Sequence, residues 1–488
     1  MHQPVGPYAC TDVTIEEAAP AAERLLTYRS AAGRWVLLAT VLGSALAAVD
    51  ATVVAIALPS IGDDLGASFA GLQWTVTGYT LTLASLVLLS GAAGDRFGRR
   101  RVFLIGVVWF TLASLLCAAA PTIGLLVAAR VLQGVGGALL TPASLSILES
   151  TFTESDRGAA IGTWAGFSGV AGALAPLIGG WLLGLGSWRW VFLVNLPLAA
   201  LVVALSLRNI PESFDRDARG RLDWAGAALT VVLLGAGTYA LIDLSWTAAA
   251  VAAVALIAFL AVERRARQPL LPLSLFRIRQ FSAVNAVTLV VYAPIGVYFF
   301  LLVVQLQVVA GWSPLASGTA TIPVTAITLL LSGRCGALAQ RIGPRLQLTV
   351  GPLLCAGGML LSLRIDGSTS YAADVLPAVT VLGLGLATLV APLTATALSA
   401  APPENSGLAS GLNNAVARTA ALLAIAAVPV AAGLTGDVFD DPVGFDDGFG
   451  VAMTICAGLF LVGGALAAVA VEPPGRAEVR QRPEREAP

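Results

Sequence analysis

The chain has 488 residues, of which 57% are hydrophobic and only 12% are charged. That charged fraction is roughly half the fraction found in soluble proteins, so the composition indicates a polytopic membrane protein. The net charge of −1 excludes the basic surface of a nucleic-acid-binding protein, and the lone histidine, His2, offers no histidine-ligated metal site. No cofactor is expected.

Apolar segments long enough to cross a bilayer recur along the whole chain. A transmembrane helix needs ~20 such residues, and fourteen segments qualify, which predicts an all-α polytopic fold. They centre in about 35–57, 74–92, 102–120, 123–149, 159–185, 189–207, 224–242, 247–262, 281–305, 315–335, 346–363, 372–396, 407–433 and 449–471.

Arginine-rich loops indicate how the chain is oriented. With fourteen spans these loops all fall on one face, and the positive-inside rule makes that face cytoplasmic. Both termini are therefore expected in the cytoplasm, in a multi-pass protein of the cell membrane. Carboxylates at span ends, namely Glu149, Asp243 and Glu263, are expected to be solvated. The basic loops are 24–34, 96–101, 208–221, 264–279, 334–345 and 476–485.

One loop motif occurs twice. Residues 91–100, GAAGDRFGRR, resemble residues 336–345, GALAQRIGPR, at an offset of 245, and GVGGA at 134–138 has a weaker echo at 383–387. Transporters built from parallel repeats hold substrate near the midplane between their halves. The repeat predicts two six-span bundles, two additional spans between them and two cytoplasmic tails. The corresponding ranges are 1–34, 35–208, 209–280, 281–472 and 473–488.

Two opposite charges lie inside the first and fourth spans. Asp50 is the only carboxylate well inside a span, and Arg130 lies at a similar depth, ~12 Å from the start of its helix. Burial favours the neutral form of a carboxyl group and a nearby arginine favours the charged form, a balance that suits reversible proton binding. The alternative is a static ion pair that only fixes helix register. We expect Asp50 and Arg130 to couple protons to transport, since ionisable residues inside a membrane are functional by default.

The fourth span adds polar and small residues to this pair. Gln133 follows Arg130 by three positions and therefore shares its helix face. Gly134 and Gly136 come next, and small residues let neighbouring helices approach closely. We expect these three residues to belong to the same site.

The repeated loop holds more than its arginines. Asp95 can cap the following helix or pair with an arginine across the interface between the halves, and Gly98 permits a tight turn. If the arginines served only to set topology, the matched glycines and Asp95 would have no explanation. We therefore expect a cytoplasmic gate formed by Gly91, Asp95, Arg96, Gly98, Arg99 and Arg100.

The fifth span is rich in glycine and contains one proline. Small-residue packing and a hinge both account for this composition, and both can hold. The residues concerned are Gly162, Pro176, Gly179 and Gly180.

Deep aromatic and polar side chains are candidates for a substrate cavity. Among them Arg418 has no acid in its own span, and three roles stay open: snorkelling, binding a backbone carbonyl, or meeting an anionic substrate group. The spans of the second half contain no carboxylate, so a divalent cation would find only Asp50 as a counter-charge. The candidates are Tyr79, Tyr292, Tyr298, Phe299, Gln305, Asn413 and Arg418.

Taken together these motifs resemble the major facilitator superfamily, specifically its fourteen-span drug:proton antiporter branch of the EmrB/QacA type. Residues 50–59, DATVVAIALP, resemble the first-span motif, although Ala55 stands where asparagine is usual. The 91–100 loop resembles the superfamily's conformational latch, and RVLQGVG at 130–136 resembles the fourth-span motif. The 162–180 segment is similar to the antiporter motif, and WRWVFLVNLP at 188–197 to the start of the sixth span.

This resemblance implies a six-plus-two-plus-six helical fold and a non-enzymatic, proton-coupled antiporter that exports small amphipathic drugs or antibiotics by alternating access. Asp50 would carry the proton and Arg130 would tune it. The partners would be the substrate, protons and the lipid bilayer, with the chain acting as a monomer. The alternatives are uptake or exchange of a metabolite and, from another class, a membrane-embedded enzyme or sensor.

Overall fold

The computed structural model describes residues 25–214, 222–266, 269–402, 406–436, 438 and 441–472. Three expected segments lie wholly or partly outside these residues: residues 1–24 of the N-terminal tail expected at 1–34, the C-terminal tail at 473–488, and part of the basic loop at 208–221. The described helices are α1 Ala31–Leu65, α2 Phe69–Phe97, α3 Arg99–Ala119, α4 Ile123–Thr151, α5 Glu154–Leu183, α6 Trp190–Leu193, α7 Asn195–Asn209, α8 Trp224–Ile242, α9 Trp246–Arg265, η1 Leu275–Arg277, α10 Arg279–Val308, α11 Pro314–Thr319, α12 Ile322–Ile342, α13 Pro344–Leu361, η2 Ser362–Arg364, η3 Tyr371–Val375, α14 Leu376–Ser399, α15 Ser406–Ala431 and α16 Pro442–Ala470.

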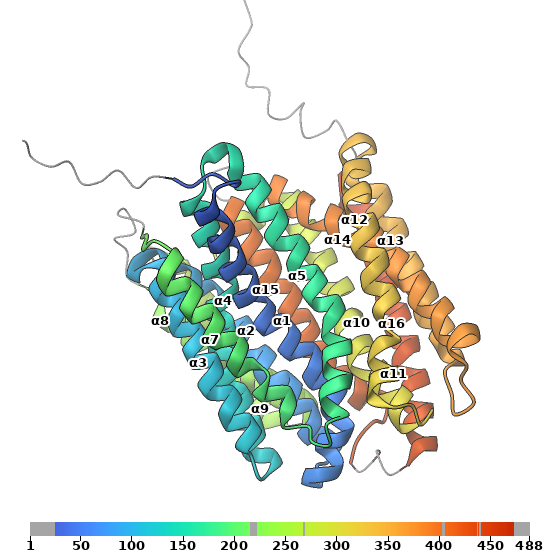
Figure 1. Ribbon diagram of the computed structural model, residues 1–488. Coiled ribbons are helices and arrows are strands. Elements are labelled where there is room, and N and C mark those ends of the chain that lie inside the picture. The colour runs from blue at the N-terminus through green and yellow to red at the C-terminus, as the bar shows by residue number, and fades with distance from the viewer. Residues whose placement is uncertain are drawn as a thin grey trace, which may run out of the picture.

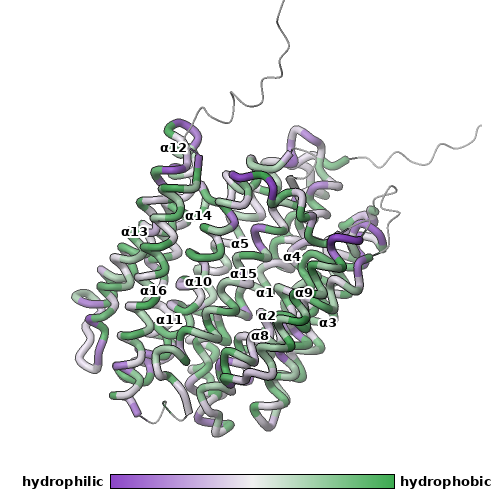
Figure 2. The backbone as a smooth tube through the Cα atoms, turned by 180° about the vertical axis from the view of Figure 1, so that it is seen from behind, coloured by the Kyte–Doolittle hydropathy of each residue, from purple (hydrophilic) through white to green (hydrophobic). Residues whose placement is uncertain are grey.

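Fourteen helical segments in the described part are long and apolar enough to cross a membrane, which confirms the expected number of spans. Four spans are composite: α6 continues into α7, α11 into α12, α13 into η2, and η3 into α14. Apolar residues run along the helix shafts, and polar residues gather towards the two ends of the bundle (Figure 2).

The last span begins earlier than the hydropathy of the sequence predicted. We expected it from about residue 449, yet α16 begins at Pro442, so Asp446 and Asp447 lie within a helix. The local cause is a cap, because the side chain of Asp441 accepts a hydrogen bond from the backbone N–H of Gly444. Proline in the first turn is also compatible with a helix start, since its missing N–H is not needed there.

The sequence repeat has a matching structural repeat. Gly98 between α2 and α3 has φ = 105°, and Gly343 between α12 and α13 has φ = 85°, so both turns use a backbone conformation that favours glycine. Gly106 of α3 and Gly351 of α13 then lie against the backbones of α4 and α14: a Cβ at either position would be 2.8 or 2.9 Å from a leucine Cβ. The two halves therefore repeat both the turn and the helix contact that follows it.

The two halves meet at one end of the bundle, where several contacts join them. Gln307 Nε2 of α10 donates to the carbonyl of Ile56 in α1 at 3.0 Å. Gly180 of α5 packs so closely on α11 that a Cβ there would lie 2.4 Å from Leu315 Cα. At the opposite end α5 and α12 diverge, and both described chain ends lie on this side (Figure 1).

The two additional spans, α8 and α9, form a hairpin that contacts both halves. α8 packs against α2 of the first half and against α15 of the second. Leu234 of α8 belongs to one buried cluster with Leu81 and Ala84 of α2 and with Leu422 of α15. The hairpin thus bridges the halves along one side of the bundle.

Candidate functional site

A buried ion pair joins α1 and α4 in the middle of the first half. Arg130 Nη1 donates to Asp50 Oδ2 at 2.5 Å, and the two side chains are only 1% and 0% exposed. The guanidinium also donates from Nε to the carbonyl of Thr75 at 3.1 Å and from Nη1 to Gln133 Oε1 at 2.6 Å. The pairing inferred from matched depth is therefore present in the structure.

The second carboxylate oxygen of Asp50 has two amide donors. Gln133 Nε2 donates to Asp50 Oδ1 at 2.8 Å, and Asn195 Nδ2 of α7 donates to the same oxygen at 2.9 Å. Both amides also donate to Ser114 Oγ of α3, at 2.8 and 3.2 Å. Asp50 thus holds together four helices, α1, α3, α4 and α7.

Sequence reasoning did not assign Asn195 or Ser114 to this site. Asn195 lies inside the 188–197 segment that carried the resemblance in the sixth span, and a carboxamide near the start of an apolar span was the available signal. Ser114 gave no signal, because a lone serine in an apolar helix more often bonds its own backbone.

Aromatic rings cover the guanidinium of Arg130. Its Cζ lies 4.3 Å from the ring centroid of Tyr79 and 5.9 Å from that of Phe192. Such rings stabilise a cation electrostatically while keeping water away. Thus Tyr79, expected to line a substrate cavity, is 4% exposed and packs against the ion pair.

The glycines of α4 make this packing possible. A Cβ at Gly134 would lie 1.9 Å from Thr82 Oγ1 of α2, and a Cβ at Gly136 would lie 2.7 Å from the backbone nitrogen of Phe110 in α3. Close approach of neighbouring helices at these positions, predicted from the sequence, is confirmed.

The repeated loop forms ion pairs within the first half. Asp95 pairs with Arg99, four residues later, at 2.9 Å rather than with an arginine across the halves. The backbone N–H of Arg100 donates to Glu212 Oε1 at 3.1 Å, and its side chain donates to the carbonyl of Ile210. Glu212, which follows α7, is the anchor that the sequence did not reveal.

The fifth-span residues fall into two groups. Gly179 and Gly180 lie at the closed end, where added Cβ atoms would be 3.2 Å from Val53 and 2.4 Å from Leu315, and the carbonyl of Pro176 lies against Gly318 of α11. Gly162 lies towards the other end and has no atom within 4 Å of the position of a Cβ. In this conformation the motif therefore packs tightly only where the halves meet.

Three residues expected in the substrate cavity lie elsewhere. Tyr298 and Gln305 are 0% exposed and Asn413 is 6% exposed, all inside the second half. Gln305 donates to Asp446 and to the carbonyl of Ile365, while Asn413 donates to Asn285 and Thr288. These hydrogen bonds are made to neighbours within the same half, while Gln305 Oε1 is buried without a partner. The three residues do not line the cavity described below.

The other three candidates are half-buried: Tyr292, Phe299 and Arg418. Arg418 Nε donates to Asn414 Oδ1 at 2.7 Å, one helical turn away, and no described carboxylate forms an ion pair with it. Its helix, α15, packs against α2 of the first half.

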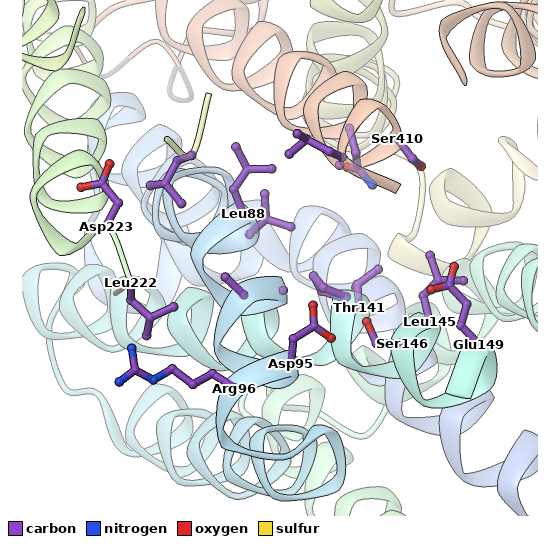
Figure 3. Close-up of a pocket in the computed structure, with 18 of the residues that line it drawn as sticks. Leu88, Asp95, Arg96, Thr141, Leu145, Ser146, Glu149, Leu222, Asp223 and Ser410 are labelled. Carbon is purple, nitrogen blue, oxygen red and sulfur yellow. The ribbon is translucent and has the colours of Figure 1, made fainter. Parts of the chain in front are cut away.

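A cavity of about 630 Å³ opens between the halves at the end where they diverge (Figure 3). It is lined by α2, α4 and α15 and by the segments flanking the α8–α9 hairpin. Three carboxylates, Asp95, Glu149 and Asp223, contribute to its wall together with Arg96 of the repeated loop. Gly91 and Asn414 also line it, so the repeated loop and the turn next to Arg418 face the same space.

The cavity shows that this conformation is open at the end that bears the repeated loop and closed at the other. The described residues contain no group of three or more His, Cys, Asp or Glu side chains able to hold a metal. The candidate site is therefore the buried, hydrogen-bonded carboxylate of Asp50, in a bundle that is closed at one end and open at the other.

Several curated proteins are similar to this chain in sequence. The multidrug resistance protein Stp of Mycobacterium tuberculosis is 36% identical over 78% of this chain and 72% of its own length. The puromycin resistance protein pur8 of Streptomyces alboniger is 36% identical over 90% of this chain and 91% of its own. The tetracenomycin C resistance and export protein of Streptomyces glaucescens is 37% identical over 83% and 77%.

The fold matches solved transporters at low identity. A bacterial homologue of the lysosomal transporter Spinster, in an inward-facing conformation, superimposes with a TM-score of 0.65 at 17% identity, over 90% of this chain and 96% of its own. A peptide transporter in complex with sulfate gives a TM-score of 0.65 at 16% identity, over 90% and 97%. The family model of the Major Facilitator Superfamily matches residues 40–425. The chain therefore belongs to the Major Facilitator Superfamily, in the branch that contains drug-resistance transporters.

Proposed function

We propose that this protein exports small amphipathic compounds, drugs or antibiotics among them, in exchange for protons. The observation that carries the proposal is Asp50: a carboxylate 1% exposed, placed in an apolar bundle and bonded to one guanidinium and two amides. An acid so placed is expensive to ionise without those donors, and its protonation changes the balance of the whole cluster.

Protonation of Asp50 would weaken the contacts that join four helices. A neutral carboxyl group has one donor and reduced acceptor strength, so its bonds to Arg130, Gln133 and Asn195 cannot all persist. Because these residues lie on α4 and α7, their rearrangement would shift those helices relative to α1. Proton binding would thereby change how the helices of the first half pack against one another.

The cycle would use the two ends of the bundle alternately. In the conformation described, substrate would enter the cavity from the side of the repeated loop, while Gly180 and Leu315 keep the opposite end shut. Asp95, Arg99, Arg100 and Glu212 pair within the first half in this conformation, and they would contact the second half when that loop end closes. We assign this loop end to the cytoplasm, with both termini there, and we expect a monomer.

The cargo is proposed to be neutral, zwitterionic or singly charged. Relatives are named for resistance to puromycin, methylenomycin A and tetracenomycin C. Beyond the cavity wall with its three carboxylates, Arg418 is positive and Asp50 is already engaged by Arg130, so a dication that moves deeper would meet little compensating charge.

The test is export by an efflux-deficient host expressing the chain with Asp50→Asn. The substitution keeps the shape and hydrogen-bonding capacity of the side chain but removes its titration, so resistance should fall to the level of the host. A protonophore added to cells that express the wild type should have the same effect. Asp63→Asn, an exposed acid on the same helix, should leave resistance intact. Export by Asp50→Asn against a gradient, driven by a proton gradient, would make Asp50 structural. The direction of flux in inverted vesicles separates export from uptake.

A further inference from the structure

The α8–α9 hairpin carries two carboxyl groups at the end of the bundle that opens. Asp223 caps α8, accepting a hydrogen bond at Oδ1 from the backbone N–H of Gly226 at 2.7 Å. Glu263 lies in the last turn of α9 and accepts at Oε2 from the backbone N–H of Leu271 at 3.1 Å. Glu263 is only 3% exposed, so the expectation that it is solvated was wrong.

The remaining oxygen of each carboxyl group is buried and has no hydrogen-bond partner: these are Asp223 Oδ2 and Glu263 Oε1. Both oxygens flank Gly226. A Cβ at that position would lie 2.6 Å from Asp223 Oδ2 and 2.9 Å from Glu263 Oε1. The two unpartnered oxygens therefore face the same small space, which only a glycine leaves open.

Among the ion pairs of the described residues, none joins an arginine to Asp223 or Glu263; Arg221 and Arg267 lie outside the described residues. Arg264 and Arg265 follow Glu263 but are exposed, and neither forms an ion pair with Asp223 or Glu263 in the described structure. Within α8 no charged residue follows Asp223, and residues 269–274 carry no charge. On α2, Asp95 and Arg96 line the same cavity as Asp223, and Asp95 is bound to Arg99; on α15, Arg418 is bound to Asn414.

Two ionised carboxylate oxygens beside the same small space, with no donor between them, repel each other. A single proton removes this conflict, because it turns one oxygen into a donor and the other into its acceptor. We propose that Asp223 and Glu263 bind one proton between them, forming a proton site separate from Asp50. Asp223 lines the cavity, so the site exchanges protons with the solvent on the open side (Figure 3).

The bound proton ties the start of α8 to the end of α9. Because α8 contacts α2 and α15, a hairpin stabilised in this way holds the two halves together more rigidly. When the proton leaves, two like charges remain at the base of the hairpin and loosen it. The site therefore makes the bridge sensitive to pH on the open side.

Thermal unfolding of the purified full-length protein in detergent tests the proposal, with a thiol-reactive dye that reports exposure of the buried Cys117, Cys355 and Cys456. Above the ordinary titration range of carboxyl groups, the native protein would hold one proton more than the unfolded chain. Its stability should then fall as pH rises, until the shared proton has left.

Glu263→Gln supplies a permanent amide donor to Asp223. At low pH its unfolding temperature should match that of the wild type. As pH rises, its unfolding temperature should fall less than that of the wild type, because the part of the fall that this pair causes is absent. The matched control is Asp243→Asn, which changes an exposed acid at the other end of α8 and should keep the wild-type profile. An unchanged pH profile in Glu263→Gln would overturn the proposal.

Infrared spectroscopy gives a second readout that does not depend on stability. The wild type at neutral pH should show the carbonyl stretch of a buried protonated carboxyl group, which both Asp223→Asn and Glu263→Gln should remove. Asn at 223 can still cap α8, so this variant is expected to fold. Persistence of the band in both variants would show that neither residue holds the proton. Neither measurement requires transport, so the result is independent of the proposed function.

Discussion

Asp50 and Arg130, eighty positions apart in the chain, form an ion pair between two helices, with 2.5 Å between Arg130 Nη1 and Asp50 Oδ2. Neither side chain is more than 1% exposed. Each charge depends on the other, because the apolar bundle offers no water to replace a lost partner. Removing one partner of such a pair typically costs about 3–5 kcal/mol, since the other charge stays buried.

Arg130→Ala should therefore lower the unfolding temperature and abolish export. The double variant Asp50→Asn with Arg130→Ala should be more stable than Arg130→Ala alone, because it no longer buries an unpaired acid. Thermal unfolding of the three variants measures the coupling, with Arg264→Ala, an exposed arginine, as the control. A double variant no more stable than the single one would mean that the ion pair contributes little.

Asn195→Ala should shift the pH dependence of export. The substitution removes one of the two amide donors to Asp50 Oδ1, and a carboxylate that loses a donor is less stable in its charged form. We expect the pH profile of export in vesicles to move upward and stability to fall by about 1–3 kcal/mol.

The control for this variant lies on the same helix. Asn209 donates only to the carbonyl of Leu205, within α7, so Asn209→Ala should leave the pH profile unchanged. An Asn195→Ala protein with the profile of the wild type would exclude Asn195 from proton coupling.

Gly180→Ala should prevent closure of the end where the halves meet. The added methyl group would lie 2.4 Å from Leu315 Cα, a backbone atom that cannot move without displacing α11. In a cysteine-free background, Gln307→Cys should then become more reactive towards an impermeant maleimide added outside, and export should fall.

Gly162→Ala is the matched comparison, since nothing lies within 4 Å of the added methyl group in this conformation. It should keep the labelling pattern of the parent protein. Equal labelling in Gly180→Ala and Gly162→Ala would show that the contact between α5 and α11 does not seal the bundle.

Single-cysteine labelling of intact cells checks the orientation. Pro211→Cys and Ser274→Cys, both exposed and flanking the two additional spans, should be shielded from an impermeant reagent. Thr247→Cys, exposed in the first turn of α9, should be labelled. Labelling of Pro211→Cys or Ser274→Cys from outside would reverse the proposed topology.

A resistance panel of matched monovalent and divalent amphipathic cations checks the charge of the cargo. Resistance to the divalent members should be weak, because the deep residues provide no second free acid. Strong resistance to divalent members that depends on Asp50 would contradict this expectation. It would direct attention to Glu149, which lines the cavity as a further acid.

The sequence by itself determined the elements and their depth in the membrane. A bilayer demands long apolar helices, so hydropathy alone predicted the fourteen spans, and the constant rise of a helix placed Asp50 and Arg130 at the same level. The turn at Gly98 was also predictable, because its conformation favours glycine and its motif recurs at Gly343.

Only the tertiary structure decided which way each helix face turns. Lipid tails are as apolar as a protein core, so the pattern of apolar residues does not distinguish a face that meets lipid from one that meets another helix. For this reason Tyr298, Gln305 and Asn413 were expected at a cavity and lie inside the second half. For the same reason the donor Asn195 and the buried carboxyl group of Glu263 emerged only when the helices were packed together.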